Sequence, residues 1–294
     1  MKAAWSYSGH DCRYSNDSLS DPFLELAATN AIHPPLPVRA VDAPRFSIVT
    51  STFNAAASLS VTAQSLAQQT CRDFEWIVMD GASGDGTVDV VRGFNGLVTE
   101  FVSEPDSGIY DAWNKALPRV RGQWILFLGA GDTLYAADVL EKASIALGRL
   151  APEITTAYGD VTVVDAVTGE DTRVRDHVFQ GLAGPWGGGR PLLPCHQGVF
   201  QRARVFESFR FDQRCRISAD NEVLLSELLA GRGEKLELMV ARFQAGGISA
   251  QSKNRLRMVS ESIYINWKLG IFWHRPLYQL SVLVANSMAH MFRR

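Results

Sequence analysis

Aspartates follow two apolar runs of this chain, at points where glycines begin. Asp80 and Asp85 belong to the turn Asp80-Gly-Ala-Ser-Gly-Asp-Gly-Thr87, and Asp132 ends the turn Gly129-Ala-Gly-Asp132. The glycines permit positive φ, so the backbone can fold closely around a bound group. The carboxylates of such turns can accept hydrogen bonds from a ligand or from backbone amides. The spacing therefore predicts a polar site formed where strands end.

Two predicted strands and a helix position the first of these turns. Residues 46–54 begin with β-branched and aromatic side chains and end in hydroxyls and an amide, which is typical of a buried strand that enters a loop. Residues 55–69 carry apolar side chains at helical spacing, with Ser58 placed to cap the helix, and residues 74–79 form a second strand. This βαβ order indicates a parallel sheet, whose ligands bind beyond the carboxyl ends of the strands.

The three glycines after the second strand raise the alternative of a dinucleotide site. Their order is Gly81, Gly84 and Gly86, which differs from G-x-G-x-x-G, and they follow the second strand instead of the first. The pattern G-x-x-x-x-G-K-[ST] is also absent from the sequence. A tight turn that only caps a helix starting near Thr87 remains an alternative.

Two further segments extend the pattern. They are Ser103-Glu-Pro-Asp-Ser-Gly-Ile-Tyr-Asp-Ala-Trp-Asn-Lys115 and Gly122-Gln-Trp-Ile-Leu-Phe-Leu-Gly-Ala-Gly-Asp132. With the first strand and the turn at Asp80, they give four ordered motifs that resemble the family 2 glycosyltransferases, which are inverting enzymes. The resemblance covers roughly residues 46–249. It implies an α/β protein with the GT-A fold, a Rossmann-like and mostly parallel central sheet flanked by helices, here with a C-terminal helical extension.

The resemblance also implies an activity. A sugar would move from a nucleoside-diphosphate sugar to a hydroxyl of a glycan or lipid-linked acceptor, in the biosynthesis of a bacterial surface polysaccharide. The nucleoside would sit near Ser51, Thr52 and Phe53, where Phe53 supplies a stacking face. Asp80 would bond the base or the ribose.

A second group of residues matches the family segment that crosses beneath the donor. Asp106 would bind sugar hydroxyls, and Asn114 and Lys115 would lie beside it, with Lys115 meeting phosphate. The alternative for Lys115 is a surface ion pair with Asp111 at i,i+4 spacing.

Transfer leaves negative charge on the departing diphosphate, and a divalent cation stabilises that charge as a Lewis acid. Hard oxygen ligands suit Mg²⁺ or Mn²⁺. Asp132 matches the last acidic residue of the family's metal-binding turn, so the resemblance makes it the metal ligand. Family members commonly carry further acidic residues there, whereas this chain has glycine and alanine, so we expect weak metal affinity without the donor. Alternatively, Asp132 only caps a helix starting near Leu134.

An inverting transfer also requires a general base that removes the proton of the acceptor hydroxyl. Residues 211–225 resemble the family segment in which an acidic residue precedes a helix, and that position falls on Asp220. The alternative is that Asp220 only caps this helix, which would begin at Asn221.

Three other segments are expected near the site. The glycine-rich loop of residues 185–191 is predicted to be a lid that closes over the donor. His196 lies in a segment that resembles the acceptor side of the family, so it would contact acceptor or phosphate unless its role is structural. Residues 245–249 resemble a late loop that closes one side of the pocket.

The composition fits one catalytic domain with extensions. The chain has 294 residues, is 46% hydrophobic and carries a net charge of −2, which does not indicate a general nucleic-acid binder. We expect an N-terminal extension and linker at 1–44, a catalytic domain at 45–258 and a C-terminal amphipathic segment at 259–294. The cysteines, at positions 12, 71, 195 and 215, lack C-x-x-C spacing, which indicates reduced thiols in the cytoplasm.

The termini set the expected location. Residues 1–44 lack the apolar core of a signal peptide, and Pro34-Pro-Leu-Pro37 indicates an extended linker. Residues 263–292 mix aromatic, apolar and basic side chains without a run long enough to span a bilayer. We expect peripheral contact with the cytoplasmic face of the inner membrane; docking on the catalytic domain or a dimer contact are the alternatives.

Two other functions are alternatives to sugar transfer. The first is an inactive protein of the same fold that binds a nucleotide sugar or glycan, because the metal turn is sparse in acidic residues. The second is nucleotidyl transfer, which would require a basic, glycine-rich phosphate loop near the first strand.

Overall fold

The computed structural model describes residues 43–165, 168–245 and 251–291, all within one compact unit that begins at Val38. The predicted extension at 1–44 lies outside this range except for its last two residues. The predicted late loop at 245–249 lies outside it except for Ala245.

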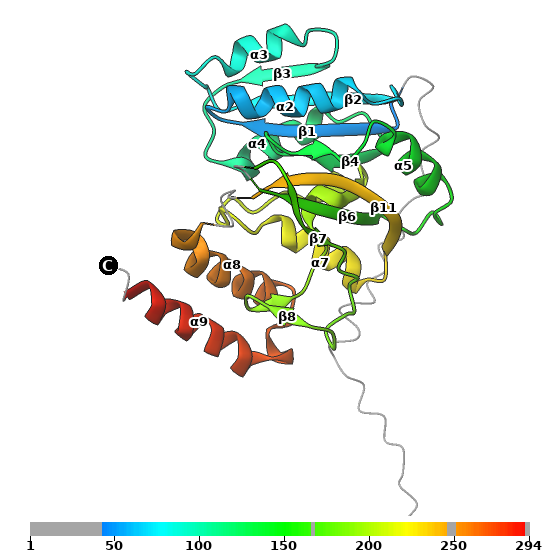
Figure 1. Cartoon of the computed structure of the whole chain (residues 1–294). Coiled ribbons are helices and arrows are strands. Elements are labelled where there is room, and N and C mark those ends of the chain that lie inside the picture. Colours follow the sequence, from blue (N-terminus) through cyan, green and yellow to red (C-terminus); the bar gives the residue numbers. More distant parts are fainter. Residues whose placement is uncertain (1–42, 166–167, 246–250, 292–294) are drawn as a thin grey trace, which may run out of the picture. The chain divides into compact units, whose positions relative to one another are not determined.

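The described residues form a nine-stranded mixed sheet (Figure 1). The strand order is β3-β2-β1-β4-β10-β6-β11-β5, with β7 paired to β6, and β8 and β9 form a separate two-stranded sheet. The strands are β1 Phe46–Thr52, β2 Phe74–Asp80, β3 Glu100–Ser103, β4 Trp124–Phe127, β5 Thr133–Leu134, β6 Thr156–Val164, β7 Asp171–Arg175, β8 Trp186–Gly187, β9 Arg190–Pro191, β10 Val199–Arg202 and β11 Gly233–Gln244.

The predicted βαβ unit is confirmed, and its parallel pairing brings the polar strand ends together. Strands β3, β2, β1 and β4 are parallel, whereas β10 runs antiparallel to both of its neighbours. Thr52 at the end of β1 is paired with Asp80 at the end of β2. The turns that follow β2 and β4 therefore leave the sheet at the same edge.

Helices cover both faces of the sheet. The α-helices are α2 Ala56–Ala67, α3 Thr87–Gly93, α4 Ile109–Ala116, α5 Val139–Gly148, α6 Val205–Ser208, α7 Asp220–Leu229, α8 Arg255–Lys268 and α9 Pro276–Met291. Alternate residues of β1 point to opposite cores, as the strand period requires. Ile48 packs with Leu59 of α2 on one face, and Val49 packs with Trp113 of α4 on the other.

Local details differ from the sequence-based expectations around the turn at Asp132. The predicted helix near Leu134 is wrong, because Thr133–Leu134 forms the short strand β5, paired with β11, and the next helix starts at Val139. Asp132 is therefore not a helix cap. Ser58 does not cap α2 either, since the helix already begins at Ala56.

The C-terminal segment forms two helices that pack on each other, α8 and α9, joined by a 3₁₀ turn at Phe272–His274 (Figure 1). Buried Asn266 of α8 donates to the side chain of Gln279 on α9 at 2.8 Å. One face of α9 is left exposed and apolar. Within the described ranges, no helix is long and apolar enough to cross a bilayer. The exposed apolar side chains of α9 are Leu277, Leu280, Val284, Met288 and Met291.

Candidate active site

The predicted nucleoside end of the site gathers where β1 and β2 end. The Gly81 amide donates to the carbonyl of Thr52 at 2.9 Å, and Ser51 precedes it in the same strand, opposite Met79. Phe53 is 64% exposed, as a face that stacks on a ligand would require. A Cβ at Gly81 would lie 2.8 Å from Asp106 Oδ2 and 3.2 Å from the Phe53 ring. Gly81 thus allows the close approach of Phe53 and Asp106.

Asp80 is almost completely buried, and its carboxylate is already occupied. The hydroxyl and amide of Ser83 donate to it, and the Ser103 hydroxyl donates at 2.6 Å. These bonds hold the glycine-rich turn against β3. A direct bond from Asp80 to the base or the ribose stays a prediction. Ser83 or Ser103 could make the same bond.

Asp85 shows the alternative foreseen for such a carboxylate, a bond to backbone amides. It accepts from the Ala56 amide at 3.1 Å and from the Thr87 amide at 3.0 Å, at the starts of α2 and α3. The Thr87 hydroxyl also donates to Asp85, and this bond is the largest cause that lowers the pKa of the Asp85 carboxyl, ahead of the amide bonds. Asp85 therefore fixes two helix starts beside the site.

The residues expected beneath the donor make contacts within the protein. Asp106 Oδ1 accepts from the Gly108 amide at 2.8 Å, which leaves Oδ2 toward Gly81. Lys115 Nζ lies 3.4 Å from Asp111, so the alternative pair is present, and 3.0 Å from Glu104. A contact between Lys115 and phosphate stays a prediction.

Asn114 joins α4 to the segment that leads to Asp220. Its amide nitrogen donates to the Phe211 carbonyl at 2.8 Å, and its oxygen accepts from the Phe211 amide at 2.9 Å. The side chain is thus engaged on both sides. Its predicted place beside the donor is untested, and the observed role is to fix Phe211.

Asp132 carries a buried charge with little compensation. It is 6% exposed, and among the described residues its carboxylate accepts two long bonds, from the backbone amides of Gly129 at 3.2 Å and Gln244 at 3.4 Å. Burial raises the pKa of the Asp132 carboxyl to about 7. A carboxylate in this setting fits a divalent cation, which would restore the charge balance.

The protein offers that cation few other ligands. In the part of the chain that the structure describes, no group of three or more His, Cys, Asp or Glu side chains could hold a metal ion. Mg²⁺ and related ions commonly take one or two protein carboxylates and complete their shell with water and phosphate oxygens. Asp132 would be the protein's contribution.

Asp220 is the first residue of α7 and Ala219 occupies the N-cap position, so Asp220 does not stand at the cap that the alternative assigned to it. The Tyr110 hydroxyl donates to Asp220 Oδ1 at 2.7 Å. The other oxygen, Oδ2, lies 3.7 Å from His196 Nδ1. The Asp220 side chain is 17% exposed, so one of its oxygens can meet a substrate hydroxyl.

His196 lies flat on Trp113, with ring centroids 5.1 Å apart and 19° between the planes. Both of its ring nitrogens are buried and have no hydrogen-bond partner among the described residues. Burial lowers the pKa of the imidazole, against the opposing effect of Asp220, so the ring is neutral near pH 7. The side chain of the next residue, Gln197, lowers the pKa of Asp132 against the larger effect of burial, so two adjacent residues act on the two aspartates.

Sequence reasoning missed Tyr110, Gln197 and Arg190. Arg190 is a cation near Asp220, whose charge opposes the lowering of the arginine pKa by burial. A signal existed for Tyr110, since it is spaced by three from Trp113 on one helical face. None existed for Arg190, which reaches the site through the fold of a glycine-rich loop.

That loop, the predicted lid, forms the β8–β9 hairpin. Trp186 is paired with Pro191, and the carbonyl of Gly189 accepts from buried Asn266 of α8 at 2.8 Å. The hairpin is thus fixed to the C-terminal helices. Closure over a donor stays a prediction.

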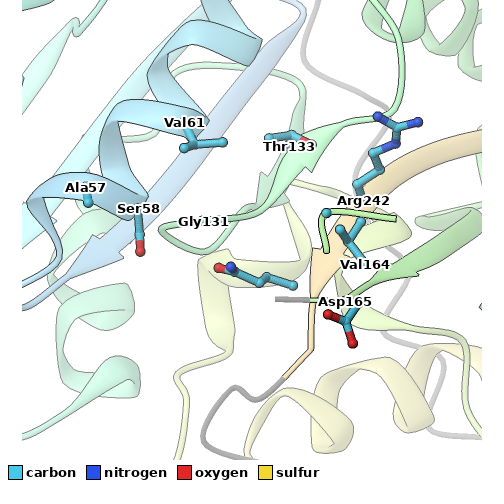
Figure 2. A pocket seen from close by; sticks show the side chains of 10 residues that line it. Ala57, Ser58, Val61, Gly131, Thr133, Val164, Asp165 and Arg242 are labelled. Atoms are coloured by element: carbon cyan, nitrogen blue, oxygen red, sulfur yellow. The ribbon is translucent and has the colours of Figure 1, made fainter. Parts of the chain in front are cut away.

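A cavity of about 420 Å³ adjoins the turn that ends at Asp132 (Figure 2). Ser58 of α2 and Gly131 face it from one side and Arg242 from the other, while Asp165 lies at the end of β6. Gln244 connects the cavity with Asp132, since its backbone amide donates to Asp132 and the residue also lines the cavity.

The mixed sheet, with helices on both faces and acidic turns at one edge, is the GT-A fold of glycosyltransferases. Solved structures of this kind share it. For S. aureus TarS 1-349 in complex with UDP-GlcNAc the TM-score is 0.59 at 15% identity, covering 75% of this chain and 66% of that one. For the mannosyltransferase PcManGT from Pyrobaculum calidifontis, in complex with GDP-Man and Mn²⁺, the TM-score is 0.54 at 17% identity. The match covers 85% of this chain and 76% of that one.

Residues 47–187 match the model of glycosyl transferase family 2, and the chain belongs to this family. A PGL/p-HBAD biosynthesis glycosyltransferase of Mycobacterium bovis is 36% identical over 189 residues, covering 60% of this chain and 67% of the relative. The putative teichuronic acid biosynthesis glycosyltransferase TuaG of Bacillus subtilis is 32% identical over 102 residues, covering 34% of this chain and 40% of the relative.

Proposed function

We propose that this protein is an inverting glycosyltransferase that moves a sugar from a nucleoside-diphosphate sugar to a hydroxyl of a glycan or lipid-linked acceptor. The observation that carries the proposal is the convergence of Asp132 and Asp220 on adjacent residues, Gln197 and His196. One carboxylate suits a cation beside the leaving diphosphate, and the other suits the acceptor side. Both are required for displacement at one carbon.

The chemistry follows from these places. Asp132 would hold Mg²⁺ or Mn²⁺, and the cation would stabilise the charge of the leaving diphosphate. Asp220 takes the proton of the acceptor hydroxyl while its oxygen forms a bond to the anomeric carbon. The bond from that carbon to the diphosphate breaks, and the diphosphate leaves with the electron pair. Attack from the opposite face inverts the configuration.

The donor and pathway are supported by the relatives. UDP, UDP-GlcNAc and GDP-Man occur in the titles of solved structures with this fold. Curated relatives carry names of surface-glycan biosynthesis. We assign this chain a nucleoside-diphosphate sugar donor and an acceptor of a bacterial surface glycan.

The C-terminal helices supply a second part of the proposal, peripheral contact with the cytoplasmic face of the membrane. Besides the exposed apolar face of α9, the C-terminal segment carries Trp267 on α8 and Trp273 in the connecting turn, which are 67% and 74% exposed. Residues 251–294 contain seven Lys or Arg and a single acidic residue, Glu261. Apolar and aromatic side chains with basic neighbours suit an anionic lipid surface.

Calorimetric binding of UDP, GDP and TDP, each with and without Mn²⁺, tests the proposal. We expect one nucleotide to bind in a Mn²⁺-dependent way and Asp132→Asn to lose that dependence. Asp220→Asn should retain nucleotide affinity while losing transfer. Binding without transfer in the wild type would support the inactive binding protein, and no binding of any nucleotide would contradict both functions.

A further inference from the structure

The strongest unassigned feature is the hydroxyl of Tyr110, bonded to the proposed base. Tyr110 is 5% exposed, and its ring stacks on Phe211 with centroids 5.6 Å apart. Trp113 meets the ring edge-on at 5.4 Å. The ring therefore cannot turn away, and its hydroxyl is held 2.7 Å from Asp220 Oδ1.

Tyr110 acts only as a donor in this bond. Burial, followed by the charge of Asp220, raises the pKa of the Tyr110 hydroxyl well above its usual range. The phenol therefore stays protonated, and Oδ1 remains occupied by its hydrogen bond. Oδ2 is the carboxylate oxygen left for a substrate.

His196 faces that second oxygen. Its Nδ1 lies 3.7 Å from Oδ2, and Trp113 supports the flat side of the ring. Neither ring nitrogen has a hydrogen-bond partner among the residues that the structure describes. A buried nitrogen without a partner is costly, which indicates that a partner arrives during the reaction.

We propose that Tyr110 and His196 are positioning residues for Asp220, with Tyr110 selecting Oδ2 as the proton-accepting oxygen and His196 receiving a hydrogen bond from Oδ2–H after transfer. The inference rests on the proposed function and deepens it. In the step, the acceptor O–H bond breaks and an O–H bond forms at Oδ2. The acceptor oxygen bonds the anomeric carbon, and the diphosphate leaves with the electron pair.

The arrangement requires the neutral imidazole with its proton on Nε2. Nδ1 is then an acceptor that the protonated carboxyl can reach after a small closing movement. Before transfer, the same nitrogen repels the carboxylate and makes no bond with it, in keeping with the 3.7 Å separation. His196 thus favours Asp220 after it has taken the proton.

The other ionisable groups around this unit are accounted for. Arg190 on β9 lies near Asp220 and remains a cation. Burial raises the pKa of the Cys195 thiol to about 11, so it stays neutral. The charge of Glu261 on α8 contributes to the raised pKa of Tyr110. The Glu261 carboxylate accepts hydrogen bonds from the amides of Ile217 and Ser218. Asp220 and His196 are therefore the two members of this unit that handle the proton in the proposed step.

The kinetic test uses Tyr110→Phe with Tyr264→Phe as its matched control. Tyr264 also donates to an aspartate, Asp212, at 3.0 Å, but away from the proposed base. Release of nucleoside diphosphate from UDP-GlcNAc or GDP-mannose, with water as acceptor, would be followed from pH 4.5 to 8.5. Saturating donor and Mn²⁺ keep the titration of Asp132 out of the profile.

We expect Tyr110→Phe to lower kcat roughly tenfold and to move the acid limb of the profile upward, because the carboxylate loses a hydrogen-bond donor. Nucleotide affinity should stay within about twofold, and Tyr264→Phe should match the wild type. A Tyr110→Phe variant with wild-type kcat and limb would overturn the inference, provided that Asp220→Asn is impaired. If Asp220→Asn is unimpaired, the proposed base itself is wrong.

A second test requires no turnover. The sequence has six histidines, so the side-chain NMR signals of His196 can be assigned with His196→Gln. Asp220→Asn removes the charge that raises the histidine pKa, so His196 should titrate at lower pH in that variant. A His196 titration that Asp220→Asn does not move would overturn the pairing, even if the donor is never found.

Discussion

Two consecutive residues act on Asp132 and Asp220, since Gln197 lowers the pKa of the first aspartate against the effect of burial and His196 Nδ1 lies 3.7 Å from Oδ2 of the second. The aspartates come from the turn after β4 and from the start of α7, which lie far apart in the chain. The short 3₁₀ turn at His196–Gly198 therefore sets their separation. A Cβ at Gly198 would lie 2.7 Å from the Gly159 carbonyl, so this turn packs directly on β6.

The raised pKa of Asp132 predicts how stability depends on pH. The pKa is about 7 in the folded protein and 3.8 for the free group, so the contribution of the protonated carboxyl is complete below pH 3.8 and is lost as pH rises through 7. Asp132→Asn should therefore gain roughly 2 to 3 kcal/mol more in unfolding free energy at pH 8 than at pH 5, without metal.

Urea unfolding at both pH values measures this difference. Asp138→Asn is the control, because Asp138 is exposed and pairs with Lys142. An equal effect of Asp132→Asn at the two pH values would show that the buried carboxyl does not titrate as expected. Mn²⁺ with the bound nucleotide should stabilise the wild type and not the variant.

Gly81 and Gly84 form a matched pair in the glycine-rich turn. A Cβ at Gly81 would lie 2.8 Å from Asp106 Oδ2, whereas nothing lies within 4 Å of one at Gly84. We expect Gly81→Ala to weaken nucleotide binding about tenfold, a cost of about 1.4 kcal/mol, and Gly84→Ala to leave it unchanged. Calorimetry measures both, and equal affinities would place the nucleotide away from Asp106.

The two bonds from Asn114 to Phe211 predict a structural effect with a catalytic consequence. Asn114→Ala leaves the Phe211 amide and carbonyl without partners, so unfolding free energy should fall by about 2 to 4 kcal/mol. Because Phe211 supports the Tyr110 ring, kcat should fall as well.

The control is Asn286→Ala, which loses one bond to a carbonyl of its own helix and should cost about 0.5 kcal/mol or less. Urea unfolding and nucleotide release from the donor report the two effects. A similar loss of stability in both variants would mean that Asn114 contributes no more than a surface asparagine.

The exposed face of α9 predicts binding to anionic vesicles. Replacing its apolar residues by serine should reduce binding at least tenfold, because each side chain that enters the lipid contributes about 1.5 kcal/mol or more. A control with exposed apolar residues elsewhere should bind as the wild type does. The variant carries Leu280→Ser, Val284→Ser and Met288→Ser, and the control carries Ile145→Ser, Val174→Ser and Val178→Ser.

Co-sedimentation with phosphatidylglycerol vesicles measures the difference. If the α9 variant binds as well as the control, the apolar face serves another purpose. A change from dimer to monomer in the same variant would assign the face to a second copy of the chain.

The sequence was sufficient for the βαβ core because its strands are continuous apolar runs and its turns carry glycine and aspartate at fixed places. The roles of Asp132 and Asp220 follow from the family resemblance and stay predictions. Sequence reasoning failed at Leu134, because a two-residue strand is stabilised by its partner β11 and not by its own residues. Local propensity carries no information about such a partner.

The contacts of the site residues were harder to foresee. Asp80 was expected to meet a ligand, yet serines from two segments occupy its oxygens. Lys115 lies between two carboxylates, one of which, Glu104, the i,i+4 rule does not reach. These contacts depend on tertiary folding, which brings together residues from separate segments. Among the missed site residues, Tyr110 was the one whose helical spacing indicated burial.

The side-chain nitrogen of Asn266 donates both to the Gly189 carbonyl and to the Gln279 side chain. The first belongs to the hairpin that carries Arg190 toward Asp220, and the second belongs to α9. The outer helix and the proposed reaction centre therefore share one anchor. The hairpin near Asp220 and the outer helix are thus connected through one buried side chain, although they lie far apart in the sequence.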